Sequence, residues 1–278
     1  GSKIMLGEDV LKAGHAPIAN EADRIAALDA VSHAFLLIAV LLSGLMVFIW
    51  LTRGRISAAV AGDNNLSQGR LLDALRSRWA IFGALAIGLY VGAEVSISSI
   101  MINFLNLPEI MGLPLEIAGF YLANIYWMGA LIGRLLGSYM LTRIAATKLL
   151  MGAASIASLL CLTVALSAGP IAGYAALSVG LFNSIMFPTI FTITLERAGV
   201  SQASTSGLLC LAIVGGALLP YVVGRMADQS SLVFSFMVPM LAYGVIAVFG
   251  FLSRGAKVYR KDAVQGADIS PTMPGGSN

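Results

Sequence analysis

The stretch Trp79 to Leu105, WAIFGALAIGLYVGAEVSISSIMINFL, decides the fold because it is long and apolar enough to cross a bilayer. A helix rises about 1.5 Å per residue, so about 20 apolar residues span a hydrocarbon core of about 30 Å. One carboxylate, Glu94, lies near the middle of this stretch. A charge at that depth is costly unless it is paired, hydrated or neutralised, so the sequence predicts a polar pathway beside this helix. A protonated glutamate that bonds a neighbouring helix is the structural alternative.

The composition excludes a soluble globular domain. Of the 278 residues, 58% are hydrophobic and only 11% are charged, which predicts an all-α, polytopic helical membrane protein. The net charge of +3 is assigned to loop topology, and no nucleic-acid partner is expected. Cys161 and Cys210 lie inside apolar runs and are interpreted as small buried side chains. No metal site and no cofactor are expected.

Hydropathy divides the chain into seven apolar runs, at about 34–52, 79–105, 115–141, 146–167, 170–195, 204–224 and 231–252. The long connection 53–78 carries Arg53, Arg55, Arg70, Arg76 and Arg78, so the positive-inside rule places it in the cytoplasm. Alternation then puts the carboxyl terminus on the same side. The expected organisation is an outer polar loop (1–33), a first span (34–52), the basic loop (53–78), a six-helix domain (79–253) and a disordered cytoplasmic tail (254–278).

Small residues predict where these helices approach each other closely. Gly88 and Gly92 in the second span, and Gly133 and Gly137 in the third, have the GxxxG spacing of helix packing.

Polar and aromatic residues near mid-depth are the candidates for contact with a hydroxylated ligand. Glu94 and Ser98 are one turn apart on one face of the second span, and Tyr90 extends that face. A carboxylate and a hydroxyl at this spacing could bond two adjacent hydroxyl groups of a ligand. Lipid contact and core packing stay open for the aromatic candidates.

Two later spans repeat the pairing of an amide with an aromatic ring. Asn124 and Trp127 are three residues apart in the third span, and Asn183 and Phe187 are four apart in the fifth. An amide both donates and accepts hydrogen bonds, and a flat ring can pack against an apolar face of a ligand. Bonds between helices could also satisfy these amides without any ligand.

Other residues are candidates for structural or gating roles. Arg134 lies within the third span, too far in depth from Glu94 for a direct salt bridge, and is expected to reach the cytoplasmic side or brace a helix-end carbonyl. Arg225 and Asp228 are expected to form a surface gate or cap. Pro188 and Pro220 free backbone carbonyls inside the bilayer, which suits a transporter but also a packing kink.

Four segments carry a resemblance to a known family. They are YVGAEVSISSIMINFL (90–105), IGRLLGSYMLTR (132–143), FNSIMFPTIFTITLERAG (182–199) and SGLLCLAIVGGALLPYVVGRMAD (206–228). Together they resemble the fucose/glucose/galactose:proton symporter family of the major facilitator superfamily, in order from about residue 79 to residue 253.

The resemblance implies an organisation and a partner. Family members have twelve spans in two six-helix halves, so the spans here would correspond to the sixth through twelfth. The chain would then be a carboxyl-terminal half whose missing amino-terminal half supplies the coupling carboxylates and the other wall of the sugar site. The resemblance also implies that the polar and aromatic residues named above near mid-depth are sugar contacts. The loop from Gly137 to Lys148, which includes Arg143, only loosely matches the superfamily's Gly-x-x-x-Asp-Arg gating signature. Leu141 follows Met140 where that pattern requires an aspartate.

The function expected from these observations is symport of a neutral hexose such as glucose or galactose with a cation, a proton or else sodium. The expected location is the bacterial inner membrane. The alternatives are a truncated half with no transport of its own and a seven-span receptor. A retinal protein is disfavoured because all five lysines lie outside the spans, and no enzyme is expected because His15 and His33 come at or before the first span.

Overall fold

The protein is described by a computed structural model that covers residues 21–60 and 71–259. Within these residues the chain is helical and no strand occurs. The elements in order are α3 (Glu21–Val60), α4 (Leu71–Ala74), α5 (Arg78–Asn106), α6 (Leu115–Tyr121), the π-helix η1 (Leu122–Trp127), α7 (Met128–Leu141), α8 (Ala146–Leu166), α9 (Gly169–Asn183), α10 (Met186–Arg197), α11 (Gln202–Ala212), α12 (Gly215–Gln229), the 3₁₀ helix η2 (Phe234–Phe236) and α13 (Met237–Ser253).

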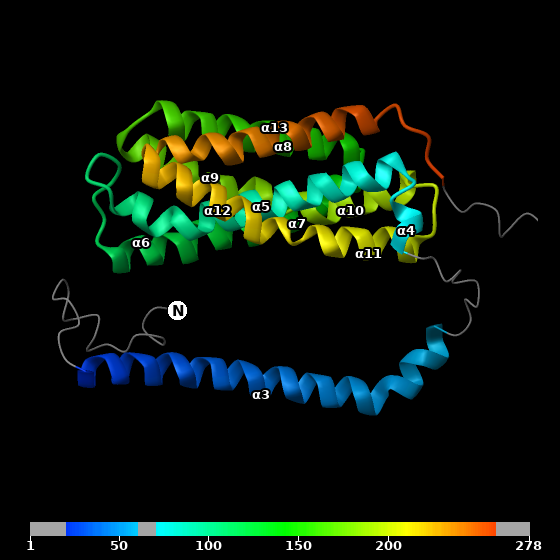
Figure 1. The fold of residues 1–278 in the computed structure, drawn as a ribbon, viewed down its shortest axis with the longest axis horizontal. Coiled ribbons are helices and arrows are strands. Elements are labelled where there is room, and N and C mark those ends of the chain that lie inside the picture. The colour runs from blue at the N-terminus through cyan, green and yellow to red at the C-terminus, as the bar shows by residue number, and fades with distance from the viewer. Residues whose placement is uncertain (1–20, 61–70, 260–278) are drawn as a thin grey trace, which may run out of the picture.

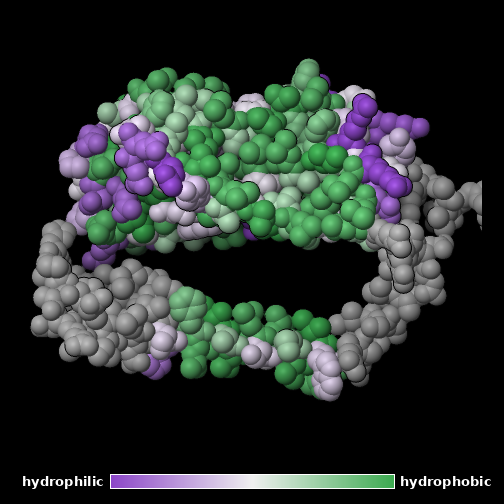
Figure 2. Space-filling view, in the orientation of Figure 1, coloured by the Kyte–Doolittle hydropathy of each residue, from purple (hydrophilic) through white to green (hydrophobic). Residues whose placement is uncertain are grey.

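Seven segments of the described chain are long and apolar enough to cross a membrane, which confirms the predicted fold class. They are Phe35–Thr52, Arg78–Asn106, Leu115–Leu141, Ala146–Leu166, Gly169–Arg197, Gln202–Gln229 and Phe234–Ser253. Figure 2 shows hydrophobic residues along the length of the bundle and hydrophilic residues gathered at its two ends. This distribution is the one that a bilayer requires of a spanning protein. The protein is therefore a multi-pass membrane protein.

Helix α5 forms the centre of the six-span bundle and contacts α10, α11, α12 and α13 (Figure 1). Its first turn is fixed by Ser77, whose side chain accepts a hydrogen bond from the Ala80 amide. The Ser77 hydroxyl also donates to the main-chain carbonyl of Ala198, 2.5 Å away, at the end of α10. The helix that carries Glu94 is thus held at one end by its own cap and by a neighbouring helix.

The predicted close approach at the first GxxxG pair is confirmed. A Cβ atom on Gly215 of α12 would collide with the backbone of Gly88 in α5, and one on Gly92 would meet the side chain of Leu219. Only residues without a side chain allow two backbones to come this near. Gly133 in α7 approaches the Leu181 carbonyl of α9 in the same manner.

Helix α3 lies apart from the bundle and is longer than the predicted first span (Figure 1). It begins at Glu21 and ends at Val60, because the alanine-rich polar sequence on either side of the apolar run also favours a helix. Its apolar side chains are exposed, for example Phe48 at 62% and Trp50 at 60%. Three predicted segments lie partly outside the described residues. They are the outer loop (1–33), the basic loop (53–78) and the tail (254–278).

Candidate functional site

The candidate site is built around the middle of α5, where Tyr90 and Glu94 lie one helical turn apart. Residues four apart lie on the same face of a helix, so the Tyr90 hydroxyl and the Glu94 carboxyl are neighbours on α5. Tyr90 is 2% exposed, whereas Glu94 is only partly buried. The carboxylate therefore lies beside a buried tyrosine on its own helix and stays partly accessible.

A second polar pair lies between the π-helix η1 and α9. The Asn183 amide donates to the Tyr126 hydroxyl across 3.0 Å, and both residues have no exposed surface. A π-helical turn is rare, and it shifts the register so that residues on either side face differently from those in a continuous α-helix. In this arrangement Asn183 serves as a partner of Tyr126. A role for Asn183 in sugar binding stays a prediction.

An aromatic contact extends from each of these two pairs. The rings of Tyr90 and Phe187 lie 6.2 Å apart, and Phe187 stacks on Phe191 in the next turn of α10 at 6.1 Å. Tyr126 packs edge-to-face on Trp127 at 5.3 Å. Among the predicted residues, the structure therefore brings Tyr90 against Phe187, and it brings Asn183 and Trp127 against Tyr126.

Two buried polar atoms in this region have no hydrogen-bond partner within the described residues. They are the Asn183 side-chain oxygen and the Tyr243 hydroxyl of α13. Unpaired buried polar atoms are unusual and call for an explanation such as an internal water. These two atoms could therefore form hydrogen bonds with a water or another polar group inside the bundle.

The other predicted sugar contacts lie closer to the surface. Ser98 donates to the Glu94 main-chain carbonyl at 2.9 Å, so its hydroxyl proton is used within its own helix. Asn124 is exposed, and its amide donates to the Phe120 carbonyl at 2.9 Å. Trp127 is 47% exposed, which suits a ligand-facing ring and a lipid-facing ring equally.

Arg134 braces the interrupted fifth span. Pro188 has no amide hydrogen, so the carbonyl of Ser184, four residues earlier, lacks the donor that a continuous helix would supply. The Arg134 side chain donates its Nε hydrogen to this carbonyl across 3.4 Å. The ion pairs found among the described residues do not include one between Arg134 and Glu94.

The remaining gating candidates are distributed over the surface. Arg225 donates to the Tyr221 hydroxyl at 2.7 Å and lies over that ring, so its partner is Tyr221 and no ion pair with Asp228 is found in this part of the chain. Arg143 is exposed in the loop after α7, and Pro220 lies inside α12. Gating roles for these residues stay predictions.

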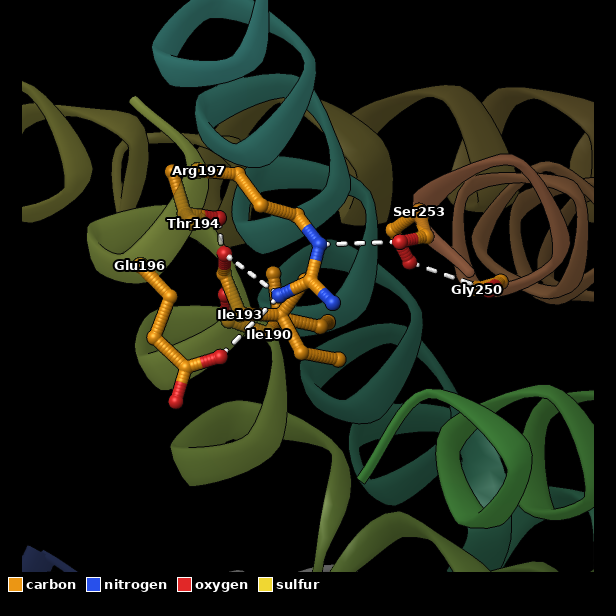
Figure 3. A network of polar contacts seen from close by, with 7 residues as sticks. All are labelled: Ile190, Ile193, Thr194, Glu196, Arg197, Gly250 and Ser253. Carbon is orange, nitrogen blue, oxygen red and sulfur yellow. Dashed lines mark hydrogen bonds and ion pairs between the residues drawn. The ribbon is translucent and has the colours of Figure 1, made fainter. Parts of the chain in front are cut away.

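A further polar network, which the sequence did not single out, ties α10 to the last span (Figure 3). Arg197 donates its Nε hydrogen to the Ser253 carbonyl at 2.8 Å, and its Nη1 lies 3.0 Å from a carboxylate oxygen of Glu196. The Arg197 side chain is 8% exposed and that of Glu196 is 47% exposed. The bond to Ser253 is therefore the buried component that fixes the ends of α10 and α13 together. Only its position at the end of a span could have drawn attention to Arg197.

Two sets of known proteins are similar in sequence to the chain, although no family model matches it. A glucose/galactose transporter of Brucella abortus (strain 9-941) is 40% identical over 187 residues, which are 67% of this chain and 45% of that protein. A putative glucose/galactose transporter of Helicobacter pylori (strain J99) is 40% identical over 61% of this chain and 42% of its own length. The L-fucose-proton symporter of Escherichia coli K12 is 31% identical over 78% of this chain and 48% of its own length.

Solved structures of a fucose:proton symporter are also similar to the chain. The Escherichia coli fucose:proton symporter FucP, a major facilitator superfamily transporter, matches with a TM-score of 0.66 and 25% identity over 89% of this chain and 60% of FucP. The peptide-transporter-family protein PepTSo matches in fold alone, with a TM-score of 0.57 and 14% identity. The match to FucP covers its carboxyl-terminal part.

The comparisons confirm the predicted resemblance to the fucose/glucose/galactose:proton symporters. The relatives are named as transporters or symporters and not as enzymes. The chain spans less than half the length of the relatives it matches in sequence.

Proposed function

We propose that this chain, a relative of the sugar symporters of the major facilitator superfamily, forms the carboxyl-terminal side of a pathway that carries a neutral hexose with a proton. The observation that carries the proposal is the half-buried carboxylate of Glu94, one helical turn from the buried Tyr90 in the middle of the central span α5. Transporters of this superfamily type bind substrate near the bilayer midplane at the interface of their two repeats. A carboxylate at that depth is a functional group by default.

The proposed sugar contacts are Glu94 and Ser98 of α5 together with Asn124 and Trp127 of the third span. The Glu94 carboxylate accepts hydrogen bonds from sugar hydroxyls, the amide of Asn124 can accept through its free oxygen, and the Trp127 ring offers a flat apolar face. Tyr90 and Asn183 are buried, and Phe187 is partly buried against Tyr90. Their proposed contribution is to hold the α5 and α10 surfaces at the correct separation, with direct contact only if the helices move apart during transport.

The substrate proposed is glucose or galactose, because relatives with these names are 40% identical, whereas the fucose symporter of Escherichia coli is 31% identical. The coupling ion proposed is a proton, on the basis of the names of the fucose symporters. The proposed location is the bacterial inner membrane with the carboxyl terminus in the cytoplasm. A missing amino-terminal half, with its own coupling carboxylates, would supply the opposite wall.

The test is uptake of radiolabelled glucose, galactose and fucose by cells that lack their own hexose carriers. The cells express this chain alone or together with an amino-terminal half from a relative. We expect uptake only with both halves, stimulation by an inward proton gradient, and no change when sodium is removed. Uptake that requires sodium would overturn the proton assignment. Uptake by the chain alone would show that its seven spans form a complete carrier.

A matched pair of variants ties uptake to the site. Glu94→Gln should lower uptake at least tenfold. Glu116→Gln, which alters an exposed carboxylate in the first turn of α6, should leave uptake unchanged. The proposed function is wrong if none of the three sugars is taken up, either with this chain alone or with both halves, although both halves reach the membrane.

A further inference from the structure

A groove of about 360 Å³ lies between α7, α8 and the end of α9, away from the cluster around Glu94. Leu136 and Met140 of α7 form one wall, and Gly152 and Ile156 of α8 form the other. Leu136 is 55% exposed and Ile156 is 42% exposed, so the groove opens on the outside of the bundle. In a membrane this surface faces lipid or another protein.

The lining is apolar along its length and carries one charge at one end. Among the described residues that line the groove, Lys148, in the first turn of α8, is the single charged one and none is acidic. Lys148 is exposed, and so is Arg143 in the preceding loop. The groove therefore has a hydrocarbon-like body and a cationic mouth.

We propose that this groove binds an anionic phospholipid, with one acyl chain between α7 and α8 and the phosphate on Lys148. Ammonium groups at the level of the headgroups attract anionic lipids, and basic sites between helices hold such headgroups. A long apolar stem also lets a lysine place its amine at the interface while its methylenes cover the groove. The inference does not depend on the transported substrate.

The dimensions favour a lipid chain over a packed helix. Along α7 the lining runs from Gly133 to Met140, which at about 1.5 Å per residue is roughly 10 Å. A transmembrane helix packs along much of the hydrocarbon thickness of about 30 Å. A groove this short, with its cation at the end nearest water, is complementary to the upper part of one acyl chain and its phosphate.

The test uses the full chain purified in detergent and mixed with equal amounts of phosphatidylglycerol and phosphatidylcholine. Native mass spectrometry then measures which lipid stays bound. We expect phosphatidylglycerol to be retained in preference, and Lys148→Gln to lower the ratio of the two lipids about fivefold, the effect of one cation at the membrane surface. Arg254→Gln removes an exposed charge elsewhere and should leave the ratio unchanged.

A second variant addresses the body of the groove without removing charge. A Cβ atom added at Gly152 meets nothing within 4 Å, so Gly152→Leu fills the groove without a clash. It should reduce retention of both lipids, whereas Gly224→Leu, at another open position, should not.

Three results would overturn the proposal. They are equal retention of both lipids by the unaltered chain, an unchanged ratio in Lys148→Gln, and a dimer mass that disappears in Gly152→Leu. The third result would assign the groove to a second copy of the chain.

Discussion

The Nε hydrogen of Arg134 points at the main-chain carbonyl of Ser184, 3.4 Å away, the carbonyl that Pro188 leaves without a helical donor. Arg134 in the third span therefore supplies the hydrogen-bond donor that the Ser184 carbonyl in the fifth span lacks. A free carbonyl in an apolar surrounding is costly, and a cation in the membrane is costly, but each relieves the other.

Replacement of Arg134 by glutamine should destabilise the protein through the Ser184 carbonyl. We expect a loss of about 1–2 kcal/mol in the free energy of unfolding, measured by thermal unfolding in detergent. Pro188→Ala restores an amide hydrogen opposite Ser184, so the same Arg134→Gln change should cost less in that background. Equal costs in both backgrounds would show that the carbonyl does not depend on Arg134.

Tyr126→Phe should destabilise the protein because it removes the acceptor of the Asn183 amide and leaves that group buried without a partner. An unsatisfied buried donor costs about 1–3 kcal/mol. Tyr139→Phe is the matched control, since Tyr139 is 65% exposed. Similar midpoints of thermal unfolding for the two variants would contradict the structural role of the Tyr126 hydroxyl.

Arg197→Ala should loosen the end of α13, because it removes the donor to the Ser253 carbonyl. Hydrogen bonds from charged groups contribute about 1.5–3 kcal/mol, so the midpoint of thermal unfolding should fall clearly. Hydrogen exchange should also become faster in the last turn of α13. Arg254→Ala, at an exposed position just after that helix, should change neither quantity.

Glu94→Gln should lower hexose uptake at least tenfold when both halves are expressed, because a neutral amide cannot replace the charge-assisted bonds of a carboxylate. The protein level should stay normal, since glutamine still fits the space beside Tyr90. Uptake that survives with unchanged affinity would assign Glu94 to packing, the structural alternative for an intramembrane carboxylate.

The orientation of the chain can be read from single cysteines after Cys161 and Cys210 are replaced by alanine. Ala168→Cys lies between α8 and α9, and Thr142→Cys lies at the opposite end of the bundle. A membrane-impermeant maleimide added to whole cells should label Ala168→Cys and should reach Thr142→Cys only after lysis. The reverse pattern would place the carboxyl terminus outside.

Hydropathy and spacing predicted the seven spans, the approach of Gly88 toward a neighbouring helix and the shared face of Tyr90 and Glu94. These features depend on residues near one another in sequence, so a helical period is enough to find them. The same information could not pair Asn183 with Tyr126, because that bond joins two spans and depends on the register shift of a π-helical turn.

The ends of α3 and the burial of Arg197 were also beyond the sequence argument. Polar residues with high helix propensity extend α3 past its apolar run, and a hydropathy window does not detect them. Arg197 could be recognised only as one more charge at the end of a span, because its acceptor, Ser253, lies in the last helix.

Helix α3 is longer than the thickness of the membrane that it would cross. Its 40 residues correspond to about 60 Å of helix, twice the hydrocarbon thickness of about 30 Å. Its apolar window starts at Phe35, so the helical turns from Glu21 onward stand roughly 20 Å clear of the span. The first turns of α3 therefore form a helical spacer between Glu21 and the apolar window that starts at Phe35.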